Sequence, residues 1–182
     1  MDINHLRSKI PENLGFTLVE LMVVIAVIGV VVALATPPYQ NMIERNRLKQ
    51  AVESLKSDMQ FARTEAIKRS QNVFLSPTIG DDGTWCYGLN LAAACACGTA
   101  GSCGIKTVAG SGFSTAVSMT ASTGTSLFDS RRGTHSVPPD DNLNDVTFVT
   151  DNYTARVNIN ETGRVLICTP ADTTGLPGYP DC

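Results

Sequence analysis

An uninterrupted apolar segment lies near the start of the chain. Between Phe16 and Ala35 there are twenty residues, and Glu20 is the only charged residue among them. A helix of about 20 apolar residues, rising ~1.5 Å per residue, matches the hydrocarbon thickness of a bilayer. We therefore predict a transmembrane helix over residues 16–35, with a single carboxylate near its start.

Two prolines follow this segment, and after them the apolar residues recur with the spacing of an α-helix. Proline removes a backbone donor and clashes with the preceding turn, so we expect a kink at Pro37 and Pro38; the alternative is that Pro37 ends the helix. Beyond them an apolar residue recurs every three or four positions, which predicts a helix to about residue 70 with this stripe in the core. The stripe consists of Leu48, Val52, Leu55, Met59, Ala62 and Ala66.

A helix over residues 16–70 is longer than a small domain needs. Its 55 residues span about 80 Å in a straight helix. The first half is therefore expected to pack against lipid or other copies, and only the second half against its own sheet.

From residue 71 onward, short β segments alternate with turn residues. Ala155, Val157 and Ile159 alternate with polar residues, and the connection 160–163 ends in glycine, as expected for a hairpin. Residues 120–145 are expected to form a long loop. The fold class is therefore α+β, with a long helix packed on an antiparallel sheet and a β-rich domain over residues 71–182. The expected strands are 72–79, 85–91, 105–108, 114–120, 146–150, 154–159 and 164–168.

The first fifteen residues suggest how Glu20 is tolerated. They are polar, carry Arg7 and Lys9, and end directly at the apolar segment. Cleavage after Gly15 would give Phe16 a free amine one helical turn from Glu20, or close to Glu20 of a neighbouring copy. Such a cation would offset the cost of an acid in hydrocarbon, which is at least a few kcal/mol.

Two other interpretations of this segment are open. One is a secretory signal peptide cut after Ala33-Leu34-Ala35, although its apolar region would be about 7–15 residues long and without an acid. The other is a plain single-pass anchor in which Glu20 has no role.

The sequence Gly15-Phe16-Thr17-Leu18-Val19-Glu20-Leu21 resembles the class III signal peptide of type IV pilins and type II secretion pseudopilins. The resemblance implies that a prepilin peptidase cuts after Gly15 and methylates the new N-terminal Phe16. It also implies a role of Glu20 in assembly, and that the helix can melt at Pro37 during filament formation; Pro38 exceeds the family pattern.

A second resemblance covers the end of the long helix and the segment after the first strand. Residues 62–67, Ala-Arg-Thr-Glu-Ala-Ile, and residues 85–88, Trp-Cys-Tyr-Gly, are similar to the GspH/FimT group of minor pilins and pseudopilins. This implies a type IV pilin-like fold and a minor subunit that helps to prime or cap filament assembly. A major pilin subunit is an alternative.

The same resemblance implies the partners and the location. The partners would be other pilin subunits, the prepilin peptidase, an inner-membrane assembly platform and membrane lipid. Because Arg7 and Lys9 hold the leader in the cytoplasm, the positive-inside rule predicts a single-pass inner-membrane protein with a periplasmic C-terminal domain.

All six cysteines follow the membrane segment. An even number of cysteines in an exported domain favours disulfides, and Cys95-Ala96-Cys97 is too tight for a usual zinc pair, so no metal or cofactor is expected. We predict that Cys168 pairs with Cys182 and that the other four pair among themselves. These are Cys86, Cys95, Cys97 and Cys103.

An enzyme is not expected. His135 is the one histidine after the leader, it is predicted to lie in a loop, and neither Ser136 nor the pair Asp140 and Asp141 forms a recognisable catalytic motif with it.

DNA binding is a weaker alternative function. It would fit FimT-like pilins that take up DNA through a G-R-x-R motif. Here Gly163 and Arg164 are followed by Val165 and Leu166, so the second arginine is missing; Arg131 and Arg132 form another basic pair. Residues 71–182 hold five basic and ten acidic residues, which is a weak footprint for nucleic acid.

Overall fold

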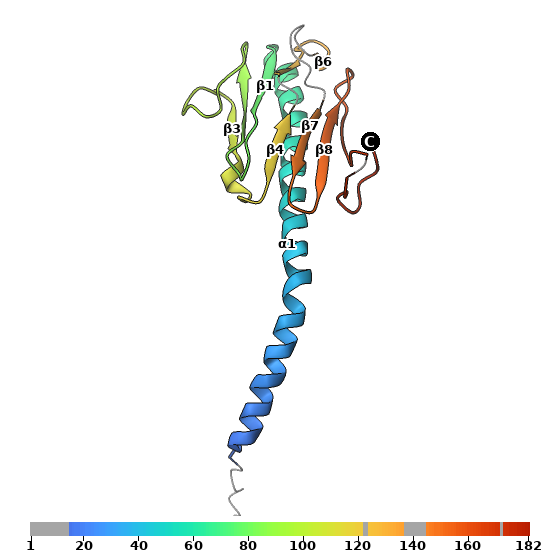
Figure 1. Ribbon diagram of the computed structural model, residues 1–182. Helices are drawn as coiled ribbons and strands as arrows, with labels where there is room; N and C mark the ends of the chain where they lie inside the picture. Colours follow the sequence, from blue (N-terminus) through green and yellow to red (C-terminus); the bar gives the residue numbers. More distant parts are fainter. Residues whose placement is uncertain (1–14, 122–123, 137–144, 172) are drawn as a thin grey trace, which may run out of the picture. The chain divides into compact units, whose positions relative to one another are not determined.

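The computed structural model describes residues 15–121, 124–136, 145–171 and 173–182, with only the backbone described at 35–38 and 121 (Figure 1). The chain divides into two units, Met1–Tyr39 and Gln40–Cys182. The second unit therefore includes the C-terminal half of the long helix as well as all the strands.

One helix, α1, extends over Leu18–Arg69. The helix continues through Pro37 and Pro38, so it does not end at Pro37. A kink at these prolines stays a prediction. At the other end, Ser70 adopts a positive φ of 52°. The N–H groups of Ser70 and Gln71 donate to the carbonyls of Ile67 and Ala66, which is the hydrogen-bond pattern of a Schellman cap and stops the helix.

In the described part of the chain, nine strands follow α1 in two antiparallel sheets, which confirms the predicted antiparallel β domain. The first sheet has the order β3-β2-β1-β5-β6 and the second the order β4-β7-β8-β9. The strands of the first sheet are β1 (Val73–Thr78), β2 (Cys86–Leu91), β3 (Lys106–Ala109), β5 (Ser126–Phe128) and β6 (His135–Ser136). Those of the second are β4 (Ser118–Ala121), β7 (Asp145–Val149), β8 (Thr154–Ile159) and β9 (Val165–Cys168).

Two of the expectations about the middle of the chain are wrong. The predicted loop over 120–145 contains β5 and β6, which extend the first sheet through pairing of β5 with β1. The expected strand 114–120 begins only at Ser118, and a short 3₁₀ turn precedes it at Gly110–Gly112. A bridge between Gly80 and Met119 joins the two sheets.

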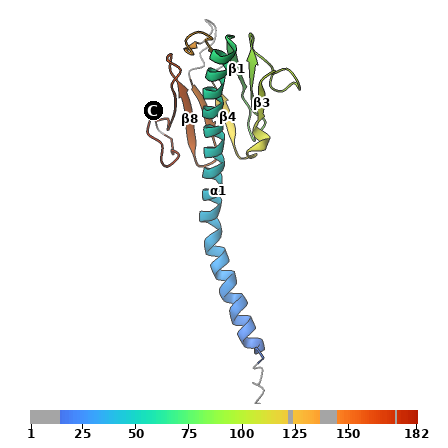
Figure 2. The same ribbon diagram turned by 180° about the vertical axis from the view of Figure 1, so that it is seen from behind.

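The second half of α1 covers one face of both sheets (Figures 1 and 2). All six residues of the predicted stripe, Leu48 to Ala66, are at most 1% exposed, which confirms that prediction. Ala155, Val157 and Ile159 of β8 also face the core, as predicted. Burial of each large aliphatic side chain contributes about 1.5–3 kcal/mol.

The C-terminal tail returns to the second sheet and to α1. Thr169 donates its N–H to the carbonyl of Pro180 and accepts the N–H of Cys182, both at 2.8 Å. Leu176 is buried in the core, and the hydroxyl of Tyr179 donates to Glu53 on α1 at 2.6 Å. The tail is therefore part of the folded unit.

Candidate functional site

The first feature of interest is the apolar part of α1. The large apolar side chains between Phe16 and Leu34 are 47–79% exposed. By length and composition, α1 is the one helix in the described residues that could cross a membrane. These side chains have no core of their own in the first unit, so other molecules must cover them in water.

Glu20 lies in the first turn of this helix. Its backbone N–H donates to the hydroxyl of Thr17 at 3.2 Å, so Thr17 acts as the N-cap and Glu20 occupies the third helical position. The positive end of the helix dipole favours an acid at this position. The sequence analysis missed this role, although the spacing Thr-x-x-Glu signals a capping box.

A buried ionic network ties α1 to the first sheet. Asp58 is 5% exposed; its carboxylate accepts the hydroxyl of Tyr87 at 2.8 Å and the ammonium of Lys106 at 2.6 Å. The Tyr87 hydroxyl also lies 3.2 Å from that of Ser54. Burial, with the nearby Asp58 charge, raises the pKa of Tyr87 well above its usual value. The network joins α1, β2 and β3, so we regard it as structural.

His135 lies on β6 and is 4% exposed, so its expected place in a loop is wrong. Its ring packs edge-on against Phe128 with the centroids 5.8 Å apart. Nε2 has no hydrogen-bond partner among the described residues, and burial lowers the pKa of His135 to about 4. Ser136 is exposed and next to it on the strand, so their side chains face opposite sides. Asp140 and Asp141 lie outside the described residues.

The structure brings the three predicted arginines close to a fourth, Arg63 of α1. Gly133 follows Arg131 and Arg132, and Gly163 precedes Arg164. The two glycines meet, since a Cβ on Gly163 would lie 2.7 Å from the carbonyl oxygen of Gly133.

Arg63 packs beneath both glycines. Its Nε would lie 3.0 Å from a Cβ on Gly133 and 3.4 Å from one on Gly163. Both glycines have positive φ angles, 60° and 78°, a conformation that disfavours other residues. Asp129 holds the first turn, because its carboxylate accepts the N–H groups of Arg131 and Arg132; these bonds lower the Asp129 pKa. We call Arg63, Arg131, Arg132 and Arg164 the arginine cluster.

A groove of about 690 Å³ runs beside this cluster, between α1 and β9. One wall comes from α1 and the other from the start of β9 and the turn before it. The lining residues are Gln60, Arg63, Thr64, Ile67, Gly163, Arg164, Val165 and Leu166. The sequence analysis gave Arg63 no part in this site, because its contacts with the two glycines are non-local.

Comparison with known proteins identifies the family. The model of the type II transport protein GspH matches residues 51–163, more than half of the chain. The chain belongs to the GspH family. A second model, the prokaryotic N-terminal methylation motif, matches residues 12–36 of this GspH-family chain. The motif and the apolar helix fit a membrane-anchored pilin of a pilus or pseudopilus. The GspH family and the similar fimbrial proteins are structural pilin subunits.

Curated relatives match a limited part of the chain. A fimbrial protein of Pseudomonas aeruginosa is 39% identical over 67 residues, which are 37% of this chain and 43% of that protein. The fimbrial protein EcpC of Eikenella corrodens is 51% identical over 37 residues, 20% of this chain and 24% of that protein. The chain thus matches less than half the length of these relatives.

A solved structure is also similar. The type IV minor pilin FimU of Pseudomonas aeruginosa is 19% identical, with a TM-score of 0.49, and the match covers 69% of this chain and 91% of that one.

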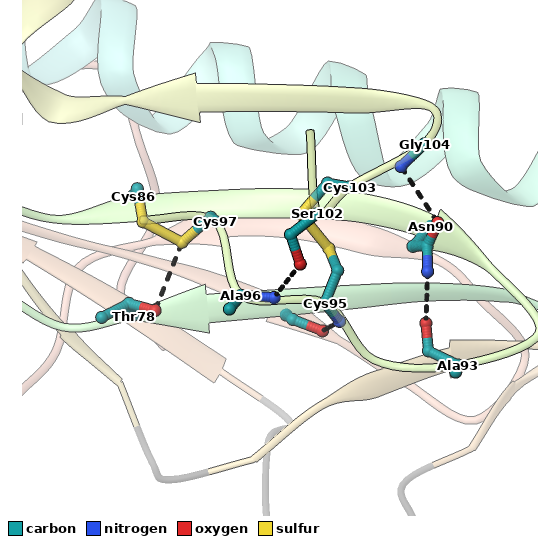
Figure 3. Close-up of a disulfide and its surroundings, with 11 residues drawn as sticks. Thr78, Cys86, Asn90, Ala93, Cys95, Ala96, Cys97, Ser102, Cys103 and Gly104 are labelled. Carbon is teal, nitrogen blue, oxygen red and sulfur yellow. Dashed lines mark hydrogen bonds between the residues drawn. A yellow bond between two sulfur atoms is a disulfide. The ribbon is translucent and has the colours of Figure 1, made fainter. Parts of the chain in front are cut away.

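The cysteines of this GspH-family chain form three disulfides. Cys168 pairs with Cys182, as the sequence analysis favoured, and the pairing left open is Cys86 with Cys97 and Cys95 with Cys103. The latter two fold the β2–β3 loop back over the strands (Figure 3). Gly88 lies directly beneath, because a Cβ there would come within 2.8 Å of the Cys95 sulfur. All six cysteines are used in this way, so none remains free to hold a metal.

Proposed function

We propose that this protein is a minor subunit of a type IV pilus or a type II secretion pseudopilus that helps to prime or cap filament assembly. The observation that carries the proposal is the exposed apolar segment at the start of α1. Glu20 is the only charged residue between Phe16 and Ala35, and it lies within the matched N-terminal methylation motif. A helix of this kind needs a bilayer or other helices around it.

The proposed mechanism is assembly rather than catalysis. Residues 16–35 hold the subunit in the inner membrane after a prepilin peptidase has cut before Phe16 and methylated its amine. An assembly platform then moves the helix into the filament core, where contacts with lipid are exchanged for contacts with other helices. Glu20 pairs there with the Phe16 amine of a neighbouring subunit, which neutralises both charges and sets the register of the subunits.

The disulfides support a periplasmic location of the second unit. Disulfides form and persist in oxidising compartments such as the periplasm, and all three lie within Gln40–Cys182. Arg7 and Lys9 in the leader agree with this orientation through the positive-inside rule.

Replacement of Gly15 by Glu tests the processing step. We expect the peptidase to fail on Gly15→Glu, because a small residue at the cut site becomes a bulky acid. The purified protein should then retain its fifteen-residue leader, and intact-mass spectrometry of wild type and variant measures this. A variant that still begins at Phe16 would contradict the proposed cut.

Replacement of Glu20 by Ala tests the charge pair. We expect Glu20→Ala to be cleaved normally but to appear in sheared filaments at a much lower level than wild type. Loss of one partner leaves the other charge buried and unpaired, which costs roughly 3–5 kcal/mol. Glu161→Ala, which removes an exposed acid from the β8–β9 turn, is the matched control. Equal incorporation of Glu20→Ala and the control would refute the pairing.

The abundance of the protein in sheared filaments tests its status as a minor subunit. Quantitative mass spectrometry should find it far below the most abundant pilin. A stoichiometry near that of the main filament subunit would instead make it a major pilin.

A further inference from the structure

Among the described residues, the β9 wall of the groove has an unpaired backbone edge. In the β8–β9 hairpin the N–H of Asn160 donates to the carbonyl of Arg164 at 3.2 Å. Bonded and non-bonded pairs alternate along an antiparallel ladder. The register pairs Ile159 with Val165 and Val157 with Ile167, so the N–H and C=O groups of Val165 and Ile167 point away from β8.

The tail already uses the next position of this edge. Thr169 follows Val165 and Ile167 in the same alternation, and it exchanges backbone hydrogen bonds with Pro180 and Cys182. Within the described residues, Val165 and Ile167 have no strand beside them on that side. An open edge of this kind can accept an additional strand.

The groove is lined by two arginines, Arg63 and Arg164. Arg131 and Arg132 lie outside the lining, next to the carboxylate of Asp129, which offsets part of their charge. Arg63 is half-buried, and in the described part of the chain its guanidinium has no hydrogen bond or ion pair. The side chains of Arg131, Arg132 and Arg164 are exposed. The nearby acid Glu65 is already engaged by Arg69 at 2.5 Å and Lys68 at 3.5 Å.

Apolar side chains complete the lining. Ile67 of α1 is 48% exposed and Leu166 of β9 is 45% exposed, and both line the groove. Backbone pairing groups, apolar side chains and arginines together match a polypeptide with acidic residues. A nucleic acid would use the arginines but neither the strand edge nor the apolar contacts.

We propose that this groove binds an extended acidic segment of a neighbouring filament subunit. The segment adds as a strand beside Val165 and Ile167 and places its carboxylates on the arginine cluster. The inference rests on the proposed function, because it takes the partner from the filament. It adds a contact made by the β domain to the contacts made by the N-terminal helix.

Photo-crosslinking of the full-length protein in its host tests the proposal. Gln60, which is exposed and lines the groove, is replaced by p-benzoylphenylalanine; Gln50, exposed on α1 but outside the groove lining, is the matched control. After irradiation of intact cells, mass spectrometry maps the cross-linked peptides. We expect position 60, and not position 50, to cross-link to an Asp- or Glu-rich segment of another protein that carries an N-terminal methylation motif.

Charge reversal provides the second arm. In the double variant Arg132→Glu/Arg164→Glu, which alters only exposed side chains, the cross-link from position 60 should fall about tenfold or more. The cross-link yield is divided by the amount of protein in sheared filaments, and retention of the three disulfides in the variant, checked by mass, shows that it is folded.

Several results would overturn the proposal. These are a cross-link to nucleic acid, to lipid or to a segment without acids; a yield unchanged by charge reversal; and no cross-link from position 60 although the protein is present in filaments. If the protein is absent from filaments altogether, the proposed function fails and this inference fails with it. If it is present without the cross-link, only the groove inference fails.

Discussion

The two halves of α1 carry similar apolar side chains, which are buried in one half and exposed in the other. In the second half, the stripe from Leu48 to Ala66 is at most 1% exposed, because the sheets cover it. In the first half, the large apolar side chains up to Leu34 are about half exposed or more. The first set stabilises the fold of one molecule, whereas the second set is available to lipid or to other subunits.

The largest expected effect comes from truncation of the same kind of side chain in each half. Leu55→Ala should lower the free energy of unfolding of the β domain by about 2–5 kcal/mol, because it leaves a cavity in the core. Ile28→Ala, in the exposed half, should leave it unchanged. Urea unfolding of the full-length protein in detergent, followed by fluorescence of Trp85, the single tryptophan, measures both. Equal effects of the two variants would contradict the division of roles.

Removal of the tail disulfide sharpens the same contrast. The double variant Cys168→Ser/Cys182→Ser removes a disulfide between residues 14 apart in the sequence. The free energy of unfolding of the β domain should therefore fall by about 2–4 kcal/mol. Insertion of residues 16–35 into the membrane should be unaffected, because the disulfide lies in the other unit. Urea midpoints and membrane fractionation measure the two outcomes. An unchanged midpoint would show that the tail is held by its other contacts alone.

His135 is expected to make the free energy of unfolding depend on pH. Burial lowers its folded pKa to about 4 from 6.5, so the unfolded chain binds more protons between these values. Stability is therefore full above pH 6.5 and falls as the pH decreases toward 4, by up to about 3 kcal/mol.

The variant His135→Leu tests this pH dependence. It should remove most of the loss of stability between pH 6.5 and 4, as measured by urea unfolding of the full-length protein at several pH values. A variant with the same pH profile as wild type would show that other groups cause the acid sensitivity.

The periodic spacing of apolar residues predicted the second half of α1 and the strand β8. The stripe on α1 and the alternation along β8 are strong because each extends over several turns or residues. The short strands β5 and β6 were missed, since they pair with β1 and with each other in a segment rich in turn residues.

The candidate site was predictable only at the N-terminus. There, Gly15, Phe16 and Glu20 lie close together in the sequence and form a recognisable motif. The arginine cluster could not be predicted from the sequence, because Arg63 reaches Gly133 and Gly163 only after the chain has folded. Asp58 was missed for the same reason, since Tyr87 and Lys106 are brought to it by two different strands.

The way the tail closes the β domain has a consequence for delivery of the protein. Leu176 fills the core, and Tyr179 bonds to Glu53, which lies 126 residues earlier in the chain. If the N-terminal helix enters the membrane first, the tail crosses last, and the domain lacks these contacts until then. Under the proposed membrane insertion, folding is complete only after the tail has been transferred, so a subunit stalled during transfer would expose an open core to proteases.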